Sequence, residues 1–290
     1  MKRFWVLFFL LVPIFGTGLF VVAPHYHWWF PYGNESASPI GQQIDGLFNL
    51  TLAITGLTFV ATQLVLVWVL WKCAKATDTE GKATFVHGSH NLEAIWTIIP
   101  SGILLFIALV QLPVVANIRV KSRFPEGAKL APIAEVTARQ FEWRIRYPSK
   151  ESSASFKTEA DVVDWLKNPR PDDLYAVNEL HVPSGRPVQI RLRSGDTQHA
   201  FFVPELRVKQ DAVPGLIIPV WFEIIDNKPY QTKFKGVSYE FLCAELCGWG
   251  HYKMKALLIS QPEEEFEAFL DRLKEEQFFD GFAKHKTETK

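Results

Sequence analysis

The residues best suited to chemistry lie in one short segment near the C-terminus. Between positions 243 and 254 the chain carries two thiols (Cys243 and Cys247), one imidazole (His251) and one thioether (Met254). Thiolate and thioether are soft metal ligands, and imidazole suits copper well. Two cysteines and a histidine would also serve zinc, but zinc rarely takes methionine. The combination therefore favours copper.

The second thiol determines which kind of copper site we expect. A blue-copper site uses one cysteine, two histidines and a weak axial methionine, so this segment has one thiol too many. Two thiolates allow two coppers to share bridging sulfurs, which spreads one electron over both metals. Such a centre suits electron transfer better than bond-making. The second histidine must come from elsewhere, and His199 is the leading candidate because it follows the turn 194–196 and precedes an expected strand at 201–203.

A disulfide or redox pair is the main alternative for the two cysteines, because disulfides are common in exported domains. Cysteines four residues apart can meet in a loop. They cannot meet in an extended strand, where their Cα atoms would be about 13 Å apart. The nearby His251 and Met254 favour a metal over the disulfide. Cys73 lies at the inner end of an apolar stretch, and we expect it to be inert.

The metal segment belongs to a polar part of the chain whose pattern predicts β-structure. Short alternating segments rich in β-branched and aromatic residues are separated by turn signals, which is typical of an antiparallel sandwich or barrel. The expected strand segments are 135–147, 178–181, 187–192, 200–203 and 216–225. Residues 149–176 are polar and read as an insertion with one short helix at 160–166. We assign residues 119–261 to this β-domain.

A helix is expected after the β-domain, over residues 262–282. It begins at Pro262, a favoured first-turn residue, and three glutamates follow in the first turn, where the helix dipole favours negative charge. Its apolar residues recur at helical spacing: Phe266, Phe269, Leu270 and Leu273. The tail 283–290 reads as disordered.

The first 117 residues have a different composition. They carry only ten charged side chains, five of each sign. The uncharged stretches 46–71 and 94–118 contain 26 and 25 residues, enough to cross a bilayer as helices, and we assign a transmembrane hairpin to residues 44–118. Residues 1–23 carry a third apolar run, which is either a signal peptide or an additional transmembrane helix.

Charge sets the expected orientation. Basic residues near the N-terminus and between the later two stretches favour a cytoplasmic location for both: Lys2, Arg3, Lys72, Lys75 and Lys82. Three cations directly after the third stretch argue the other way: Arg119, Lys121 and Arg123. Because the positive-inside rule is a bias, we expect the β-domain outside. The whole chain has 31 basic and 31 acidic residues, a balance that argues against a nucleic-acid-binding protein.

The metal segment resembles the dinuclear CuA motif of subunit II of bacterial haem–copper cytochrome c oxidases. The resemblance extends to residues 191–215 around His199, to residues 92–100 at the start of the third stretch, and to the layout of two spans followed by an outer domain. It covers about residues 41–261. It implies a membrane α-helical hairpin plus an all-β domain, a cupredoxin-like Greek-key β-sandwich or barrel with a C-terminal helix.

The resemblance also implies roles for individual residues. Cys243 and Cys247 would bridge the two coppers, and His199 and His251 would each bind one of them. Met254 would be a weak ligand to one copper. The other copper would take the backbone carbonyl of Glu245, whose side chain would bind a Mg²⁺ shared with the catalytic subunit.

Three further roles follow from the same resemblance. Asp211 would lie near the interface with the catalytic subunit, and Glu93 would lie at the inner mouth of a proton path. The family commonly has Gln-Trp-x-Trp in its first outer strand, with the first tryptophan receiving electrons. Here the run is Gln-Phe-Glu-Trp at positions 140–143, so Phe141 replaces that tryptophan. Trp143 and Trp249 are the remaining candidates for this role.

The implied function is that of the subunit through which electrons enter a terminal oxidase in a bacterial inner (cell) membrane, with the large domain on the periplasmic side. Electrons would come from a c-type cytochrome or a cytochrome-bearing respiratory complex. They would pass to haem in subunit I, where oxygen is reduced and protons are pumped. Further oxidase subunits and the lipid bilayer are the other expected partners, and no catalytic residue for oxygen reduction is expected in this chain.

Two rival functions remain open. A copper chaperone or thiol oxidoreductase also combines a Cys-x3-Cys pair with a membrane anchor, although it would need a thioredoxin-like pattern and a distant histidine. Subunit II of a quinol oxidase is a structural relative without copper. Since every ligand position is filled here, the copper-binding form is favoured.

Overall fold

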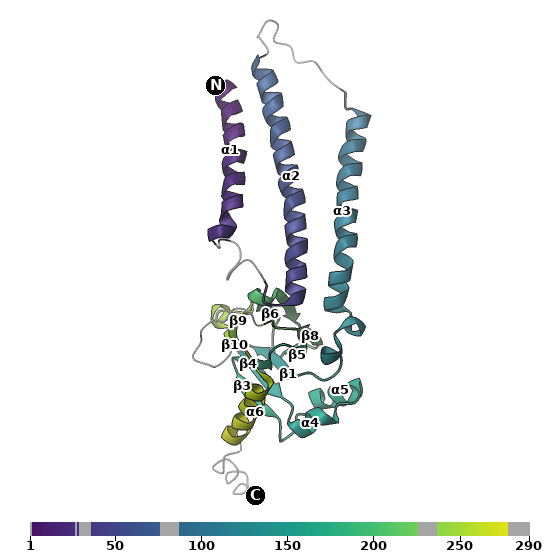
Figure 1. Cartoon of the computed structure of the whole chain (residues 1–290), viewed down its shortest axis with the longest axis vertical. Coiled ribbons are helices and arrows are strands. Elements are labelled where there is room, and N and C mark those ends of the chain that lie inside the picture. The colour runs from purple at the N-terminus through teal and green to yellow at the C-terminus, as the bar shows by residue number, and fades with distance from the viewer. Residues whose placement is uncertain (1, 27, 29–35, 76–86, 226–236, 278–290) are drawn as a thin grey trace. The chain divides into compact units, whose positions relative to one another are not determined.

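A computed structural model describes residues 2–26, 28, 36–75, 87–225 and 237–277 of the chain (Figure 1). The chain divides into two compact units. One contains residues 1–34 and 45–113, and the other contains residues 35–44 and 114–290. Each unit is described by itself. The expected tail, 283–290, lies outside the described residues.

The first unit is helical. Its helices are α1 (Lys2–Val22), followed by the 3-10 turn η1 (Ala23–Tyr26), then α2 (Pro39–Lys75) and α3 (His90–Arg119). Among the described residues, these three helices are long and apolar enough to cross a membrane. The two expected spans therefore exist as helices. Whether the segment containing α1 is cleaved stays a prediction.

Hydroxyl side chains in α2 show how a polar residue is accommodated in an apolar helix. Thr51 donates to the carbonyl of Leu47 at 2.9 Å, and Thr58 donates to that of Ile54 at 2.8 Å. In a bilayer core, water is absent and polar groups must find partners within the protein. These hydroxyls use carbonyls of their own helix, so they do not prevent α2 from spanning.

The second unit is built around two five-stranded sheets. The first sheet has the order β3-β2-β1-β5-β8 and the second has the order β4-β10-β9-β6-β7. Most neighbours are antiparallel, but β1 with β5 and β10 with β4 are parallel. The strand bounds are β1 (Ala134–Arg139), β2 (Glu142–Tyr147), β3 (Leu174–Val177), β4 (Glu179–Pro183), β5 (Val188–Ser194), β6 (His199–Val203), β7 (Val208–Ala212), β8 (Ile217–Phe222), β9 (Val237–Cys243) and β10 (Lys255–Gln261).

One hydrophobic core fills the space between the sheets. Alternation along β2 points Trp143, Ile145 and Tyr147 inward, and all three are fully buried. Phe201 of β6 and Phe241 of β9 meet Trp143 at ring-centroid distances of 5.9 and 5.3 Å. The expected sandwich is thus confirmed. The run 135–147, which reads as one strand segment, forms the hairpin of β1 and β2, whose register pairs Arg139 with Glu142.

The C-terminal helix is confirmed as α6 (Glu263–Gln277). Its apolar face packs on the sandwich, with Phe269 stacked on the buried His181 of β4 at 3.6 Å between ring centroids. Because this face is covered, α6 contributes to the core of the domain. Three short 3-10 turns precede the sheets or connect their strands: η2 (Lys121–Arg123), η3 (Glu126–Ala128) and η4 (Pro204–Leu206).

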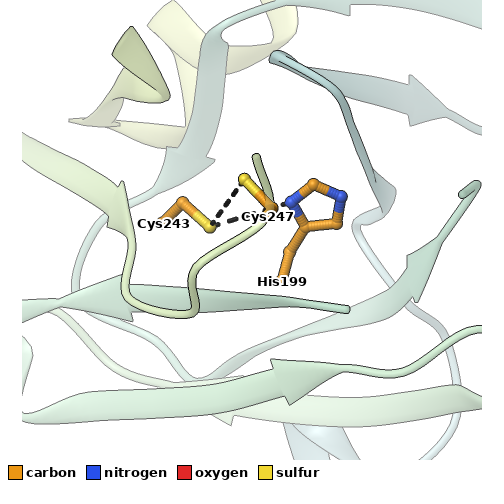
Figure 2. A group of neighbouring side chains, drawn as sticks. All are labelled: His199, Cys243 and Cys247. Carbon is orange, nitrogen blue, oxygen red and sulfur yellow. Dashed lines mark hydrogen bonds between the residues drawn. The ribbon is translucent and has the colours of Figure 1, made fainter. Parts of the chain in front are cut away.

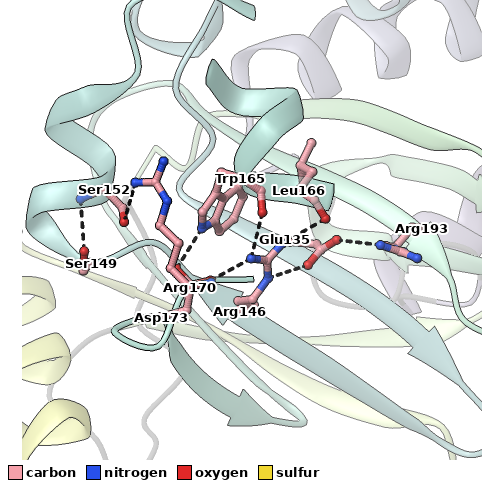
Figure 3. A network of polar contacts seen from close by, with 9 residues as sticks. All are labelled: Glu135, Arg146, Ser149, Ser152, Trp165, Leu166, Arg170, Asp173 and Arg193. Carbon is pink, nitrogen blue, oxygen red and sulfur yellow. Dashed lines mark hydrogen bonds and ion pairs between the residues drawn. The ribbon is translucent and has the colours of Figure 1, made fainter. Parts of the chain in front are cut away.

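The insertion at 149–176 contains two helices, α4 (Lys150–Ser155) and α5 (Glu159–Lys167), of which only the second was expected. A buried ionic network attaches it to the first sheet (Figure 3). The guanidinium of Arg146 lies 2.7 Å from Glu135 and 2.7 Å from Asp173, and it also donates to the carbonyl of Trp165 at 3.0 Å. The insertion is therefore fastened to the sandwich by charge as well as by apolar contact.

Candidate metal centre

Strand ends bring the predicted ligands together. His199 is the first residue of β6 and Cys243 is the last residue of β9, and these two strands are neighbours in the second sheet. Cys247 and the 3-10 turn η5 (His251–Lys253) lie in the loop between β9 and β10, and Met254 follows directly. The amide of Cys243 donates to the carbonyl of Met254 at 3.0 Å and so closes the base of this loop. Cys243 and Met254 therefore lie at the two ends of a loop that connects the paired strands β9 and β10.

The donor atoms converge on one small volume (Figure 2). The sulfurs of Cys243 and Cys247 are 3.9 Å apart, and the Cys243 sulfur lies 3.7 Å from Nδ1 of His199. All three donor atoms lie within 4.8 Å of one another. On the other side of Cys247, its sulfur lies 3.6 Å from Nδ1 of His251 and 3.4 Å from Sδ of Met254. Each thiol thus lies beside an imidazole nitrogen.

This spacing fits two soft metal ions. A metal–sulfur bond is about 2.3 Å long, so sulfurs 3.9 Å apart can both bind an ion placed between them. Both cysteines are free thiols in this arrangement. The carbonyl oxygen of Glu245 adds a hard donor 3.2 Å from the Cys243 sulfur. These residues would therefore offer two sulfurs, two imidazole nitrogens and two weaker donors to the metal.

Burial and hydrogen bonding shift the pKa values of the two thiols in opposite directions. Burial alone would raise the pKa of Cys243, but hydrogen bonds, that with His199 foremost, lower it to about 6. Burial and the neighbouring Cys243 charge raise the pKa of Cys247 to about 11. Thiolate is the form that binds metal. One thiolate is thus available near neutral pH, and the second proton leaves when a cation arrives.

A carboxylate orients His199. Oδ1 of Asp196 lies 2.8 Å from Nε2 of the ring, which leaves Nδ1 directed at the thiol. Metal-binding histidines commonly donate their second ring N–H to a carboxylate, which fixes the tautomer and increases the basicity of the ligand. Asp196 is in turn held by the amide of Gln140, at 2.7 Å, and the side chain of Gln140 donates to the carbonyl of Cys247. Sequence reasoning placed Asp196 only in a turn and missed this role.

The aromatic candidates occupy different depths. Trp143 is fully buried beneath the centre, with its ring 6.4 Å from that of His199. Phe141 is partly buried and makes an edge contact with Trp249 at 5.1 Å. Trp249 itself is 78% exposed, and it lies in the metal loop beside the exposed Tyr252. Of the three aromatics, only Trp249 presents most of its ring to a partner protein.

The loop also approaches Phe141 closely. A Cβ atom at Gly250 would lie 2.5 Å from the Phe141 ring, and one at Gly248 would lie 3.2 Å from it. Gly248 has a φ of +134°, which favours glycine. Glycines at these two positions let the metal loop lie flat against the β1–β2 hairpin.

The remaining predicted residues lie apart from the ligands or contact only one of them. Among the described residues, none forms a hydrogen bond or ion pair with the Glu245 carboxylate, although its carbonyl faces Cys243. Asp211 lies in β7, paired in register with Ala200. Glu93 lies in the first turn of α3, in the helical unit, with His90 Nδ1 at 3.4 Å from its carboxylate.

Comparison with known proteins identifies the family. The description "Cytochrome C oxidase subunit II, transmembrane domain" matches residues 27–114, and "Cytochrome C oxidase subunit II, periplasmic domain" matches residues 133–260. The chain belongs to the cytochrome c oxidase subunit II family. It is therefore a subunit of a haem–copper oxidoreductase complex in a membrane, with its large domain on the periplasmic side, as the loop charges predicted.

Individual relatives agree with this assignment. The chain is 29% identical over 255 residues to "Alternative cytochrome c oxidase subunit 2" of Bradyrhizobium diazoefficiens, covering 85% of this chain and 84% of that protein. It is 28% identical over 254 residues to "Cytochrome c oxidase subunit 2" of Cereibacter sphaeroides, covering 82% and 78%. Among solved structures, the periplasmic domain of subunit II (CoxB) of Bradyrhizobium japonicum aligns with a TM-score of 0.39 and 21% identity, over 52% of this chain and 98% of that one.

The family accounts for the architecture of the outer domain. The two mixed five-stranded sheets form a cupredoxin-like sandwich, with α6 added at the C-terminus. This subunit family is the one that binds CuA, and His199, Cys243 and Cys247 are grouped closely enough in this chain to form a possible metal site. A thiol oxidoreductase built on a thioredoxin-like βαβ unit is thereby excluded.

Proposed function

We propose that this chain receives single electrons from a c-type cytochrome, or from a cytochrome-bearing respiratory complex, and passes them to haem in the catalytic subunit. Oxygen reduction and proton pumping would follow in that subunit. The observation that carries the proposal is the convergence of two free thiols, each beside an imidazole nitrogen, on one buried volume. A bound dinuclear copper would supply a one-electron couple that changes its geometry little.

The contacts between the donor atoms support the ligand assignment. Cys243 and Cys247 would bridge, with Nδ1 of His199 on one side and Nδ1 of His251 on the other. Met254 lies against the Cys247 sulfur and would be a weak ligand to one copper, and the Glu245 carbonyl, which lies near the Cys243 sulfur, would be a ligand to the other. The chain's own residues hold these donors on paired strand ends, so the site needs little rearrangement when the electron arrives or leaves.

Electrons would enter through the exposed Trp249 and its neighbour Phe141. Trp249 provides an exposed π-system in the loop that carries the ligands, and its contact with Phe141 continues the path into the protein. Trp143 lies too deep to meet a donor protein and would act inside the domain, against His199. This arrangement would replace the exposed first-strand tryptophan that the family commonly uses.

Two further roles complete the proposal. The Glu245 carboxylate, which no described residue engages, would bind a Mg²⁺ together with the catalytic subunit, and Asp211 would lie near that same interface. Glu93 would take up protons at the inner mouth of a path into the catalytic subunit, since it lies in the first turn of α3 with an exposed carboxylate.

The decisive experiment compares Cys243→Ser with Cys73→Ser in the purified oxidase. Cys73 is an exposed thiol in α2 and provides a matched loss of one sulfur away from the site. We expect Cys243→Ser to lose the copper EPR signal in which one electron is shared by two nuclei, and to lose cytochrome c oxidation. Cys73→Ser should retain both. Unchanged cytochrome c oxidation in Cys243→Ser would refute the role of this centre, and oxidation of quinol but not of cytochrome c by the unaltered oxidase would favour a quinol oxidase subunit instead.

A second comparison tests the route of the electron. Replacing Trp249 by Leu should slow reduction of the centre by the donor protein. The copper content should not change, because the Trp249 ring lies at the surface and is not a copper ligand. Tyr252→Leu, at another exposed site in the same loop, is the control. Equal rates for the two variants would refute the assignment of Trp249.

A further inference from the structure

A cavity of about 370 Å³ lies in the second unit, where α2 begins and α3 ends. Apolar walls come from the first turns of α2, including Ile40 and Ile44, and from the last turns of α3, including Val115. The other walls are formed by β7 and β8. Because both helices continue from here into the candidate spans, the cavity lies at the outer surface of the bilayer.

The polar lining of this cavity is cationic. Arg119, Arg207 and Lys209 line it, and no acidic residue is among the described residues of its walls. The guanidinium of Arg119 donates to the neutral side-chain oxygen of Gln210. Within the described part of the chain, neither Arg119 nor Lys209 forms an ion pair with a carboxylate. The cavity therefore combines an apolar wall with the charges of Arg119 and Lys209, which no described carboxylate pairs with.

The three cations at the end of α3 and directly after it, Arg119, Lys121 and Arg123, oppose the positive-inside bias, and the contacts of Arg119 and Lys121 differ. Lys121 is paired with Glu159 of α5, so its charge is satisfied within the domain. Arg119, at the last position of α3, has only an amide partner and faces the cavity. A cation at the outer end of a span is stabilised by an anionic group at the same depth in the membrane.

We propose that this cavity binds an anionic phospholipid of the outer leaflet. The headgroup phosphate would lie against Arg119 and Lys209, because a guanidinium can donate two parallel hydrogen bonds to phosphate oxygens. The glycerol and upper acyl chains would contact Ile44 and Val115. An amphiphile uses both parts of the lining, whereas a soluble phosphate ion would use only the cations.

The test measures lipid binding to the full-length chain by native mass spectrometry in mild detergent, with phosphatidylglycerol and phosphatidylcholine as probes. A cation near an anionic headgroup contributes roughly fivefold to binding, so the double variant Arg119→Gln/Lys209→Gln should bind phosphatidylglycerol roughly 25-fold more weakly. Phosphatidylcholine binding should not change. The charge-retaining pair Arg119→Lys/Lys209→Arg should restore most of the preference for phosphatidylglycerol.

The control removes two exposed lysines of the insertion, Lys157→Gln/Lys167→Gln, which lie away from the cavity. An equal loss in this control would show general charge attraction and overturn the proposal. Displacement of the lipid by glycerol 3-phosphate at matched concentration would indicate a soluble phosphate site instead. If the assembled oxidase carries no phosphatidylglycerol and a photo-crosslinker at position 119 captures another subunit, the occupant is a protein segment and the lipid assignment is wrong.

Discussion

The contact between Asp196 and His199 allows a sharp test of the metal site, because Asp196 binds no metal itself. Its Oδ1 lies 2.8 Å from Nε2 of His199, and its Oδ2 accepts from the amide of Gln140 at 2.7 Å. In Asp196→Asn one of the two oxygens becomes an NH2 group. The asparagine can then accept from His199 or from Gln140, but not from both. The negative charge that supports the ring is also lost.

The expected magnitude follows from the type of hydrogen bond. A bond to a charged group contributes roughly 1.5–3 kcal/mol, and a neutral bond contributes about 1 kcal/mol. The carboxylate of Asp196 is partly exposed, with 30% of its side chain accessible, so the lower end of that range applies. A loss of about 1–1.5 kcal/mol corresponds to roughly five- to tenfold weaker copper binding. Asp196→Ala removes all the contacts and should weaken binding by up to about 100-fold.

The assay is competition for copper between the full-length chain and a chelator, followed by the copper-to-protein ratio and the EPR spectrum. The matched control is Glu142→Gln, which removes a carboxylate paired with Arg144 on the neighbouring hairpin. The control should bind copper as the unaltered chain does. If Asp196→Asn and Glu142→Gln hold copper equally well, Asp196 does not position the ligand.

Two further predictions concern stability. Arg146→Met leaves the buried carboxylate of Asp173 without its cation and leaves Glu135 with only the more exposed Arg193, so unfolding should become easier by roughly 3–5 kcal/mol and Tm should fall by about 10 °C in calorimetry. An unchanged Tm would contradict the assigned network. Burial lowers the pKa of His181 in spite of its contact with Glu179, so the fold favours the neutral ring. Stability should therefore be full above about pH 6.5 and should be lost as pH falls toward the folded pKa, whereas His181→Phe should flatten this dependence in thermal unfolding.

Much of the metal centre could be predicted because its ligands are local. Four side chains occur within twelve residues, and their types already indicate soft-metal chemistry. His199 comes from another strand, but the turn at 194–196 before it made it the leading candidate for the second histidine ligand. Asp196 and Gln140 could not be found in the same way. They act through contacts between the β1–β2 hairpin and the 194–199 turn, and a turn aspartate has the same local pattern whether or not a histidine lies behind it.

The fold was predictable where hydrophobic alternation is strong and not where charge is buried. β2 and β6 have the expected apolar pattern, whereas β3 lies in the polar region that was read as an insertion. Arg146 and Asp173 look like surface residues in the sequence, yet both are almost fully buried and satisfied by one another. Hydrophobic periodicity predicts that apolar residues are buried and charged residues are exposed. A buried ion pair departs from this rule because each charge compensates the other for its lost hydration.

The position of the ligands explains why the site can serve electron transfer. His199 and Cys243 end two paired strands in the core, and the β9–β10 ladder runs directly up to Met254. Backbone hydrogen bonds therefore hold His199, Cys243 and Met254 in place whether or not charge is present on the donors. A loop anchored in this way cannot follow a change in preferred coordination geometry without breaking its ladder. The fold thus favours a centre whose geometry is nearly the same in both oxidation states, and disfavours one that must open a position to bind substrate.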